Sequence, residues 1–160
     1  MAESKRIAIA RADGGVSIMT ILPADGEAPA AIAAEIEKWQ STSEVKAVGH
    51  WPIAEADIPS DRNFRDAWVH AGGGAVAVDM PKARAIHMER IRAARDAKLA
   101  ALDLPFLRAV EAGDTAKQAE IANVKQRLRD LPQSVELAGA RSPEELKAIW
   151  PEVLPPHQAA

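Results

Sequence analysis

The first stretch of the chain alternates apolar positions with small or polar ones, which is the period of a β-strand. Ile7 and Ile9 precede the run Ala12-Asp13-Gly14-Gly15, and the alternation resumes after it at Val16. Aspartate and glycine suit a tight turn with positive φ. Residues 6–22 are therefore predicted to form a β-hairpin.

The next apolar positions recur at helical spacing. Ile32, Ile36 and Trp39 fall on one face of the alanine- and glutamate-rich segment 29–40, as they do in an amphipathic helix. We expect this helix to pack its Trp39 face on the hairpin.

Two further segments return to the alternation that is typical of strands. Residues 45–53 alternate with one face that is suited to burial, and segments 67–69 and 75–78 flank Gly72-Gly73-Gly74. Glycine is the residue that a hairpin turn needs at this place. Residues 1–78 are thus predicted to form a β-rich module of about five antiparallel strands and one helix.

At Val78-Asp79-Met80-Pro81 the period changes from that of a strand to that of a helix. Asp79 is a candidate N-cap, and the ring of Pro81 suits a first helical turn. The pattern predicts a helix over residues 80–102. Its apolar face is weak, because Arg84 and Lys98 interrupt it.

The later helices are predicted from their caps and stops. Asp103 can cap a short helix that starts near Pro105 and ends at Gly113. Thr115 with Gln118 fits a capping box. The clearest helix in the sequence is predicted to begin at this capping box and to end at Pro132. Its apolar positions are Ile121, Val124, Leu128 and Leu131.

The pattern predicts that this helix forms an antiparallel pair with the helix over 80–102. The run Ser142-Pro143-Glu144-Glu145 supplies an N-cap, a first-turn proline and a reciprocal glutamate for one more short helix. Residues 79–151 are therefore predicted to be a helical module, and residues 152–160 an extended tail. The fold class is α+β, with a small antiparallel β-rich half followed by a helical hairpin and short helices.

Composition indicates a thin core. The hydrophobic fraction is 48%, but aromatic residues make up only 4% and tyrosine is absent. Periodicity places Trp39, Trp51 and Trp68 at buried positions. Trp150 ends the last helix, where it either anchors that helix or presents an aromatic side chain to a partner.

Charge and residue types narrow the function classes. A net charge of −3 argues against a general polyanion binder. The absence of cysteine removes disulfides and thiolate chemistry and is compatible with a reducing cytosol. Because no segment approaches the ~18 uncharged apolar residues of a membrane span, we expect no membrane association.

The sequence offers no recognisable catalytic or metal-binding motif. The four histidines, among them His87 on the predicted helix, are too widely separated to place two imidazoles on one helical face. The triplet Gly72-Gly73-Gly74 lacks the Lys and Ser or Thr of a phosphate-binding loop. We expect a protein without catalytic residues, metal or cofactor, and we expect His87 to be a half-buried helix residue.

Cations concentrate in the helix over 80–102, which carries six against two anions. They are Lys82, Arg84, Arg90, Arg92, Arg95 and Lys98. A solvated helix that is partly paired with acids explains this excess, and an acidic protein surface is the next use for it. Nucleic acid is not favoured, because the cations are spread around the helix and no aromatic residues are interleaved with them.

Several short motifs resemble those of phage proteins. Residues 61–68, Asp-Arg-Asn-Phe-Arg-Asp-Ala-Trp, and residues 76–83, Val-Ala-Val-Asp-Met-Pro-Lys-Ala, resemble small proteins encoded among the tail genes of phages and prophages. The segments 98–103 (Lys-Leu-Ala-Ala-Leu-Asp), 125–132 (Lys-Gln-Arg-Leu-Arg-Asp-Leu-Pro) and 149–151 (Ile-Trp-Pro) are similar to the phage tail (fibre) assembly chaperone family. The resemblance covers residues 60–151.

This resemblance implies a non-enzymatic protein that binds a tail or tail-fibre polypeptide in the host cytoplasm during assembly. Arg90, Arg92, Arg95 and Trp150 are then the candidate contact residues, since they join cationic complementarity to an aromatic anchor. One alternative is a virion component, a tail or fibre-attachment protein that stays in the particle against virion neighbours or as a homo-oligomer. Another is a nucleic-acid-binding accessory protein.

Overall fold

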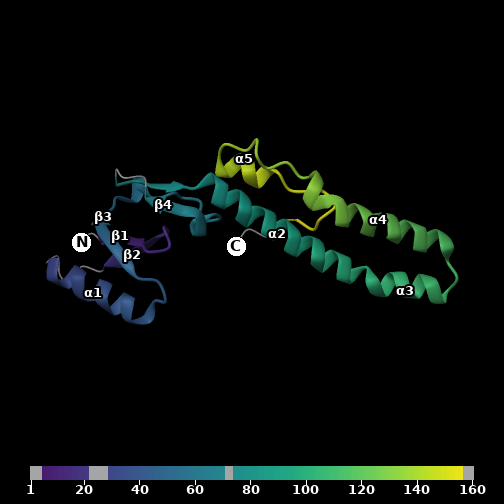
Figure 1. The fold of residues 1–160 in the computed structure, drawn as a ribbon, viewed down its shortest axis with the longest axis horizontal. Coiled ribbons are helices and arrows are strands. Elements are labelled where there is room, and N and C mark those ends of the chain that lie inside the picture. Colours follow the sequence, from purple (N-terminus) through teal and green to yellow (C-terminus); the bar gives the residue numbers. More distant parts are fainter. Residues whose placement is uncertain (1–4, 22–28, 71–73, 157–160) are drawn as a thin grey trace. The chain divides into compact units, whose positions relative to one another are not determined.

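The computed structural model describes residues 5–21, 29–70 and 74–156 (Figure 1). The chain divides after Asp79 into two compact units, here called the β unit and the helical unit. The β unit contains β1 (Lys5–Arg11), β2 (Val16–Ile21), α1 (Pro29–Thr42), β3 (Ala47–Pro52), β4 (Trp68–His70) and β5 (Val76–Val78), with 3₁₀ turns at Glu55–Asp57 and Arg65–Ala67. The helical unit contains α2 (Met80–Ala101), α3 (Asp103–Glu111), α4 (Thr115–Ser134) and α5 (Pro143–Ala148). The predicted α+β fold class is confirmed.

The β unit is built around one central strand. β1 pairs antiparallel with both β2 and β3, so the strand order is β2-β1-β3. Because successive side chains of a strand point to opposite faces, and both faces are covered, Ile7, Ala8 and Ile9 are all buried. The alternation of isoleucine with small residues in the sequence therefore marks a strand that is buried on both sides.

The two faces of this sheet carry separate apolar clusters. On one face Ile7, Ile9 and Ile21 pack with Ile36 of α1, and Trp39 packs at the margin of that cluster. The predicted packing of α1 on the hairpin is thus confirmed. The second cluster joins the opposite face of the sheet to the β4–β5 hairpin, and its buried members are Ala8, Val16, Ile53, Ile58, Trp68 and Val76.

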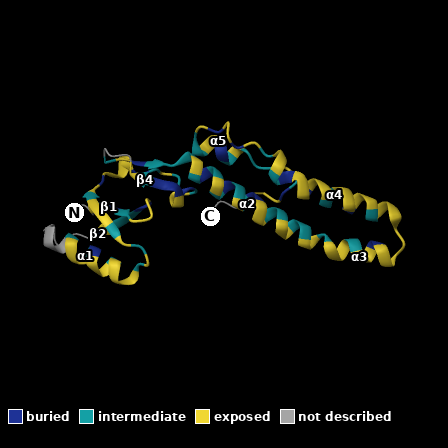
Figure 2. Ribbon diagram, viewed as in Figure 1, coloured by how far each residue is buried: buried dark blue, intermediate teal, exposed yellow. Residues whose placement is uncertain are grey.

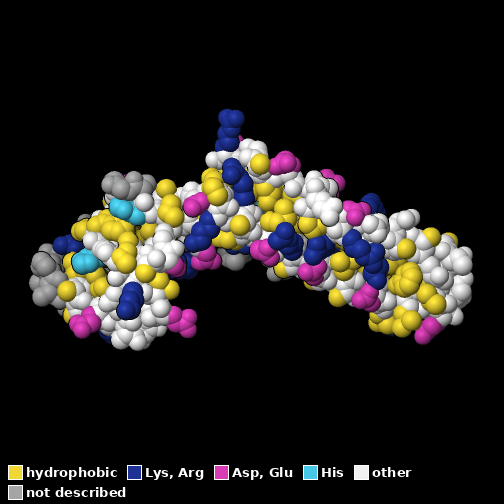
Figure 3. All heavy atoms as spheres, in the orientation of Figure 1, with side chains coloured by type: hydrophobic (Ala, Val, Ile, Leu, Met, Phe, Trp, Pro, Cys, Tyr) yellow, Lys and Arg dark blue, Asp and Glu magenta, His cyan; other side chains and the backbone are white. Residues whose placement is uncertain are grey.

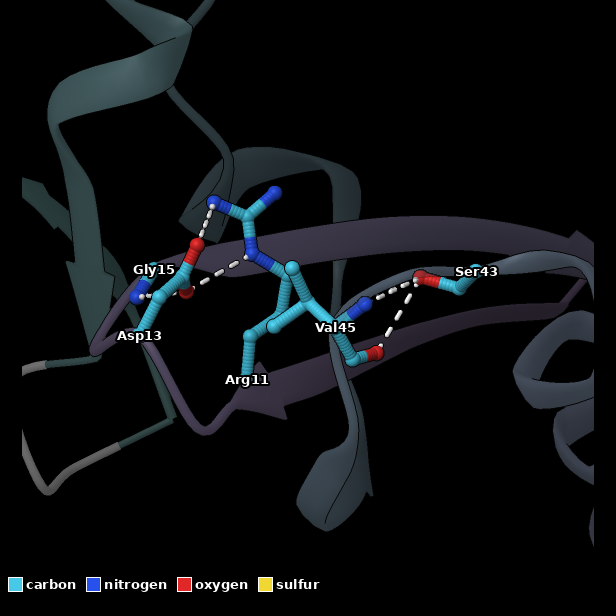
Figure 4. A network of polar contacts seen from close by, with 5 residues as sticks. All are labelled: Arg11, Asp13, Gly15, Ser43 and Val45. Atoms are coloured by element: carbon cyan, nitrogen blue, oxygen red, sulfur yellow. Dashed lines mark hydrogen bonds and ion pairs between the residues drawn. The ribbon is translucent and has the colours of Figure 1, made fainter.

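The β1–β2 turn has the chemistry that its sequence predicts. Gly14 has φ +80°, which only glycine adopts without strain. The Asp13 carboxylate accepts hydrogen bonds from Gly15 N at 2.9 Å and from Arg11 Nε at 3.0 Å, while Ser43 Oγ contacts the backbone of Val45 nearby (Figure 4). One carboxylate therefore closes the turn and orients an arginine.

The second hairpin is also confirmed. β4 pairs antiparallel with β5, with Trp68 opposite Val78. Gly74 has φ +97°, while Gly72 and Gly73 lie outside the described residues. Trp68 is buried, whereas Trp51 is half-buried. The indole N–H of Trp51 donates a hydrogen bond to the Gly74 carbonyl oxygen at 3.2 Å.

The helical unit is an antiparallel hairpin with a C-terminal segment packed on it (Figure 1). α2 gives way at Leu102 to α3, and α4 returns beside both helices. Its buried apolar residues include Ala83 and Ile91 of α2, Ala109 of α3, Leu128 of α4 and Leu146 of α5. Two of the predicted boundaries are confirmed, since Pro81 lies in the first turn of α2 and Gly113, with φ +67°, follows α3.

Three predicted caps and stops were wrong. Asp103 does not cap α3, because Leu102 before it keeps helical backbone angles and the Asp103 carboxylate forms an ion pair with Lys125 instead. The cap of α4 is Asp114 and not Thr115, since the Asp114 side chain accepts a hydrogen bond from Lys117 N at 2.8 Å. Pro132 lies inside α4, which continues to Ser134.

The buried packing of Leu131 holds this last turn in place beside the proline. The carbonyl oxygen of Leu131 accepts hydrogen bonds from Ser134 Oγ at 3.0 Å and from Val135 N at 3.1 Å.

The C-terminal segment also differs from the extended tail that was expected. Leu154 is buried, and its N–H donates to Pro151 O in a turn at 2.9 Å, while residues 157–160 lie outside the described part of the chain.

Candidate protein-binding surface

The three candidate arginines of α2 do not form one patch. A helix advances by ~100° per residue, so Arg92 and Arg95 lie on one side of α2, and Arg90 lies nearly opposite Arg92. Arg92 is paired with Glu89 one turn earlier. Arg95 contacts the neighbouring Asp96 at 2.8 Å. Only Arg92 and Arg95 are therefore brought together.

Trp150 is half-buried and is engaged within the helical unit. Its indole N–H donates to Pro155 O at 2.8 Å. Its ring meets the ring of His87 edge-on, with centroids 5.7 Å apart and an interplanar angle of 63°. Of the two roles that the sequence left open for Trp150, the geometry shows the anchor.

His87 is fully buried rather than half-buried, which corrects the expectation from the sequence. Its Nε2 lies 2.9 Å from the carbonyl oxygen of Ile149. Because a carbonyl oxygen only accepts hydrogen bonds, Nε2 must carry the proton in this contact. His87 thus holds the chain just before Trp150.

The two residues that interrupt the apolar face of α2 also form hydrogen bonds with the segment that follows α4. Arg84 Nη2 donates to Ala140 O at 2.7 Å, and Lys98 Nζ donates to Val153 O. Together with His87, these side chains bind carbonyl oxygens of the segment that follows α4. The sequence pattern was interpreted only as a weak apolar face, although the three residues share one helical face and their spacing could have revealed this role.

A band of exposed apolar side chains, here called the α3 band, lies on the outer side of α3. Leu104, Leu107 and Val110 have 54%, 52% and 47% of their surface exposed, and their three-residue spacing makes them neighbours along the helix. Most of α3 is coloured as exposed in Figure 2. Hydrophobic side chains accordingly gather at the surface of this end of the helical unit in Figure 3.

Other positions of α3 are used for internal packing. Ala109 is buried, and the Lys125 ammonium of α4 lies 5.5 Å from the centroid of the Phe106 ring. α3 therefore has one side packed on α4 and one side in solvent. Arg108 lies next to the α3 band and has no ion pair among the residues that the structure describes.

An apolar groove lies on α2, just before the turn at Leu102. It has a volume of about 360 Å³ and is lined by Ala94, Ala97, Lys98, Ala101, Leu154 and Pro155. The α2 side of the groove consists of small side chains and the stem of Lys98. The groove and the α3 band both place apolar side chains at the surface of this part of the helical unit.

Within the described residues, no three His, Asp or Glu side chains are grouped to hold a metal ion. None of the described helices is long and apolar enough to cross a membrane. Comparison with protein-family models, with curated proteins and with solved structures gives no match to this chain.

Proposed function

We propose that this protein is a non-enzymatic binding protein that holds a phage tail or tail-fibre polypeptide during assembly, with the α3 band as its main contact surface. The observation that carries the proposal is the exposure of Leu104, Leu107 and Val110 on one nine-residue helix. Contiguous exposed apolar side chains are typical of surfaces that bind another protein. The assignment to a phage tail rests on the resemblance of the motifs within residues 60–151.

Burial of the α3 band would supply a sizeable part of an interface energy. Full burial of one leucine or valine side chain contributes ~1.5–3 kcal/mol, and each of these three is about half exposed already. Their burial by a partner would therefore contribute roughly 1 kcal/mol per side chain. Arg108 beside the band, with Arg92 and Arg95 on α2, would favour a partner with acidic residues at the rim.

The test is co-expression with the candidate tail and fibre polypeptides, followed by co-purification. The variant Leu104→Asp/Leu107→Asp should lose the partner, because two charges would be buried in an apolar contact. The matched control is Ala119→Asp/Ala122→Asp, which places the same charges on the exposed side of α4. Partner recovery with the α3 variant equal to that with the control would overturn the proposal.

The arginines are tested separately. Replacement of Arg90, Arg92 and Arg95 with glutamate should weaken co-purification if their charge contributes to the contact. An unchanged yield of partner would remove them from the interface and leave the α3 band as its basis.

A protein that stays in the mature particle could use the same surface. Mass spectrometry of purified particles separates the two roles, since an assembly factor is absent from them and a structural component is present at a fixed copy number. Binding to nucleic acid is a weaker alternative, because Arg84 and Lys98 are occupied by carbonyl oxygens of the same chain. Affinity that falls steeply with salt would support it.

A further inference from the structure

A pocket in the β unit brings Arg6 together with two arginines that lie far from it in the sequence. Arg6 of β1 lies directly opposite Thr20 of β2 in the sheet, and both line the pocket with Arg62, Arg65 and Trp68. No residue that lines it carries a carboxylate. The pocket is therefore a concentrated positive site in a chain whose net charge is −3.

The segment that holds two of these arginines is fixed by buried neighbours. Phe64 and Ala67 are buried in the β unit, and the 3₁₀ turn Arg65–Ala67 follows directly on Phe64. The Asp61 carboxylate accepts a hydrogen bond from Asn63 N at 2.8 Å, which shapes the chain around Arg62. The buried side chains of Phe64 and Ala67 therefore fix the backbone that carries Arg62 and Arg65 at the pocket. A fixed backbone loses less conformational entropy when a ligand binds.

Part of the hydrogen-bonding capacity of the residues that line the pocket is not used by the protein itself. Among the described residues, the side chains of Arg62 and Arg65 have no ion pair or hydrogen bond. The indole N–H of Trp68, a residue only 5% exposed, is buried without an acceptor from the described part of the chain. A buried donor without an acceptor costs free energy. Trp68 also lines the pocket, so its indole signal can report on what binds there.

The ion pair of Arg6 indicates which kind of ligand group the arginines of the pocket can bind. Its guanidinium forms an ion pair with the carboxylate of Glu55, a residue that is mostly exposed. Arginine binds carboxylates through two parallel hydrogen bonds from its planar fork. The remaining guanidinium groups at Arg62 and Arg65 can make the same contact with a ligand.

Size and the apolar wall define the ligand further. The pocket volume is about 150 Å³, below the ~300–1,000 Å³ of pockets for drug-sized molecules. Val16, Ile18 and Ile58 form the apolar part of its lining. We propose that this pocket binds a carboxylate carried on a short apolar body, supplied by a small organic acid or by the free C-terminus of a peptide.

The experiment follows the indole N–H signals of the ¹⁵N-labelled full-length chain, with the Trp68 signal assigned by its absence in Trp68→Phe. Butyrate is the small-acid probe, and acetyl-Gly-Leu with a free C-terminus is the peptide probe. Saturable movement of the Trp68 signal by either probe is expected, and the tighter of the two identifies the source of the carboxylate. Because surface charge is screened by salt, the titration is run at low ionic strength.

Variants connect the binding to the named groups. Arg62→Gln and Arg65→Gln should each weaken binding about tenfold, because each loses a charge-assisted hydrogen bond. Arg127→Gln on the exposed side of α4 is the matched control and should bind as the parent chain does. Glu55→Gln should tighten binding a few-fold, since it releases Arg6 from a competing carboxylate.

Two results would overturn the inference. The first is a Trp68 signal that neither probe moves saturably. The second is saturable movement with inorganic phosphate alone, which would assign the pocket to a different anion. Since the pocket belongs to the β unit and the α3 band to the helical unit, these outcomes are independent of the co-purification tests.

Discussion

The β unit and the helical unit differ in how far their apolar side chains are buried. In the β unit, α1 covers one face of the sheet and the β4–β5 hairpin covers the other. In the helical unit, α3 is packed on one side only, and Leu104 and Leu107 remain more than half exposed. The β unit thus covers both faces of its sheet and leaves only single apolar side chains such as Val48 exposed among its described residues, whereas the helical unit leaves a band of neighbouring apolar side chains in solvent.

The two units also differ in the use of cations. In the helical unit, Arg84 and Lys98 bind carbonyl oxygens of the same chain. In the β unit, Arg62 and Arg65 line a pocket and have no partner for their side chains in the described structure. Charge density along the sequence pointed to the helix, yet the structure brings Arg62 and Arg65 together at a pocket of the β unit.

The largest effect is expected from Ile9→Ala. Ile9 is fully buried in the cluster under α1, and removal of such a side chain costs ~2–5 kcal/mol of unfolding free energy. If each unit is held by its own core, amide hydrogen exchange should accelerate in β1–β3 much more than in α4. Equal loss of protection in both units would break the comparison, because it would mean that they unfold together.

A smaller loss is expected from His87→Leu. The substitution removes the donor to Ile149 O and the edge contact with Trp150, and the loss of one partner of a hydrogen bond inside the protein costs ~1–3 kcal/mol. Urea unfolding measures the change. Arg92→Gln, on an exposed position of the same helix, is the control and should shift stability by less than ~0.5 kcal/mol.

Asp114→Ala should cost ~1 kcal/mol, because it removes the carboxylate that caps α4. Asp114→Asn is the matched control, since asparagine is an equally good cap. Thermal unfolding of both variants decides whether Asp114 or Thr115 begins this helix. A loss with Thr115→Ala that exceeds the loss with Asp114→Ala would restore the capping box that the sequence predicted.

The smallest effect on stability, and the sharpest test of the comparison, is expected from Leu107→Asp. The side chain is half exposed on the outer side of α3, so the free energy of unfolding should change by less than ~0.5 kcal/mol. Partner recovery should nevertheless fall. A large loss of stability would instead show that the α3 band supports the fold of the helical unit.

The order and type of the main elements could be predicted from the sequence, because period and turn chemistry are local properties. The β1–β2 hairpin at Gly14, the second hairpin, α2 and the helix over α4 were all expected. Caps were less predictable, since Asp114 and Thr115 are both good N-caps and only the backbone path selects one of them. Pro132 was expected to end α4, but the burial of Leu131 outweighs its effect.

What the sequence alone determined is therefore the α+β character, the change of period at Asp79 and the absence of thiol chemistry. The tertiary structure decided which cations are used internally, that Trp150 packs against His87, and that Arg6 meets Arg62 and Arg65 at one pocket. These are long-range contacts. Periodicity reports which face of an element is apolar, but only the packed chain determines which distant groups that face meets.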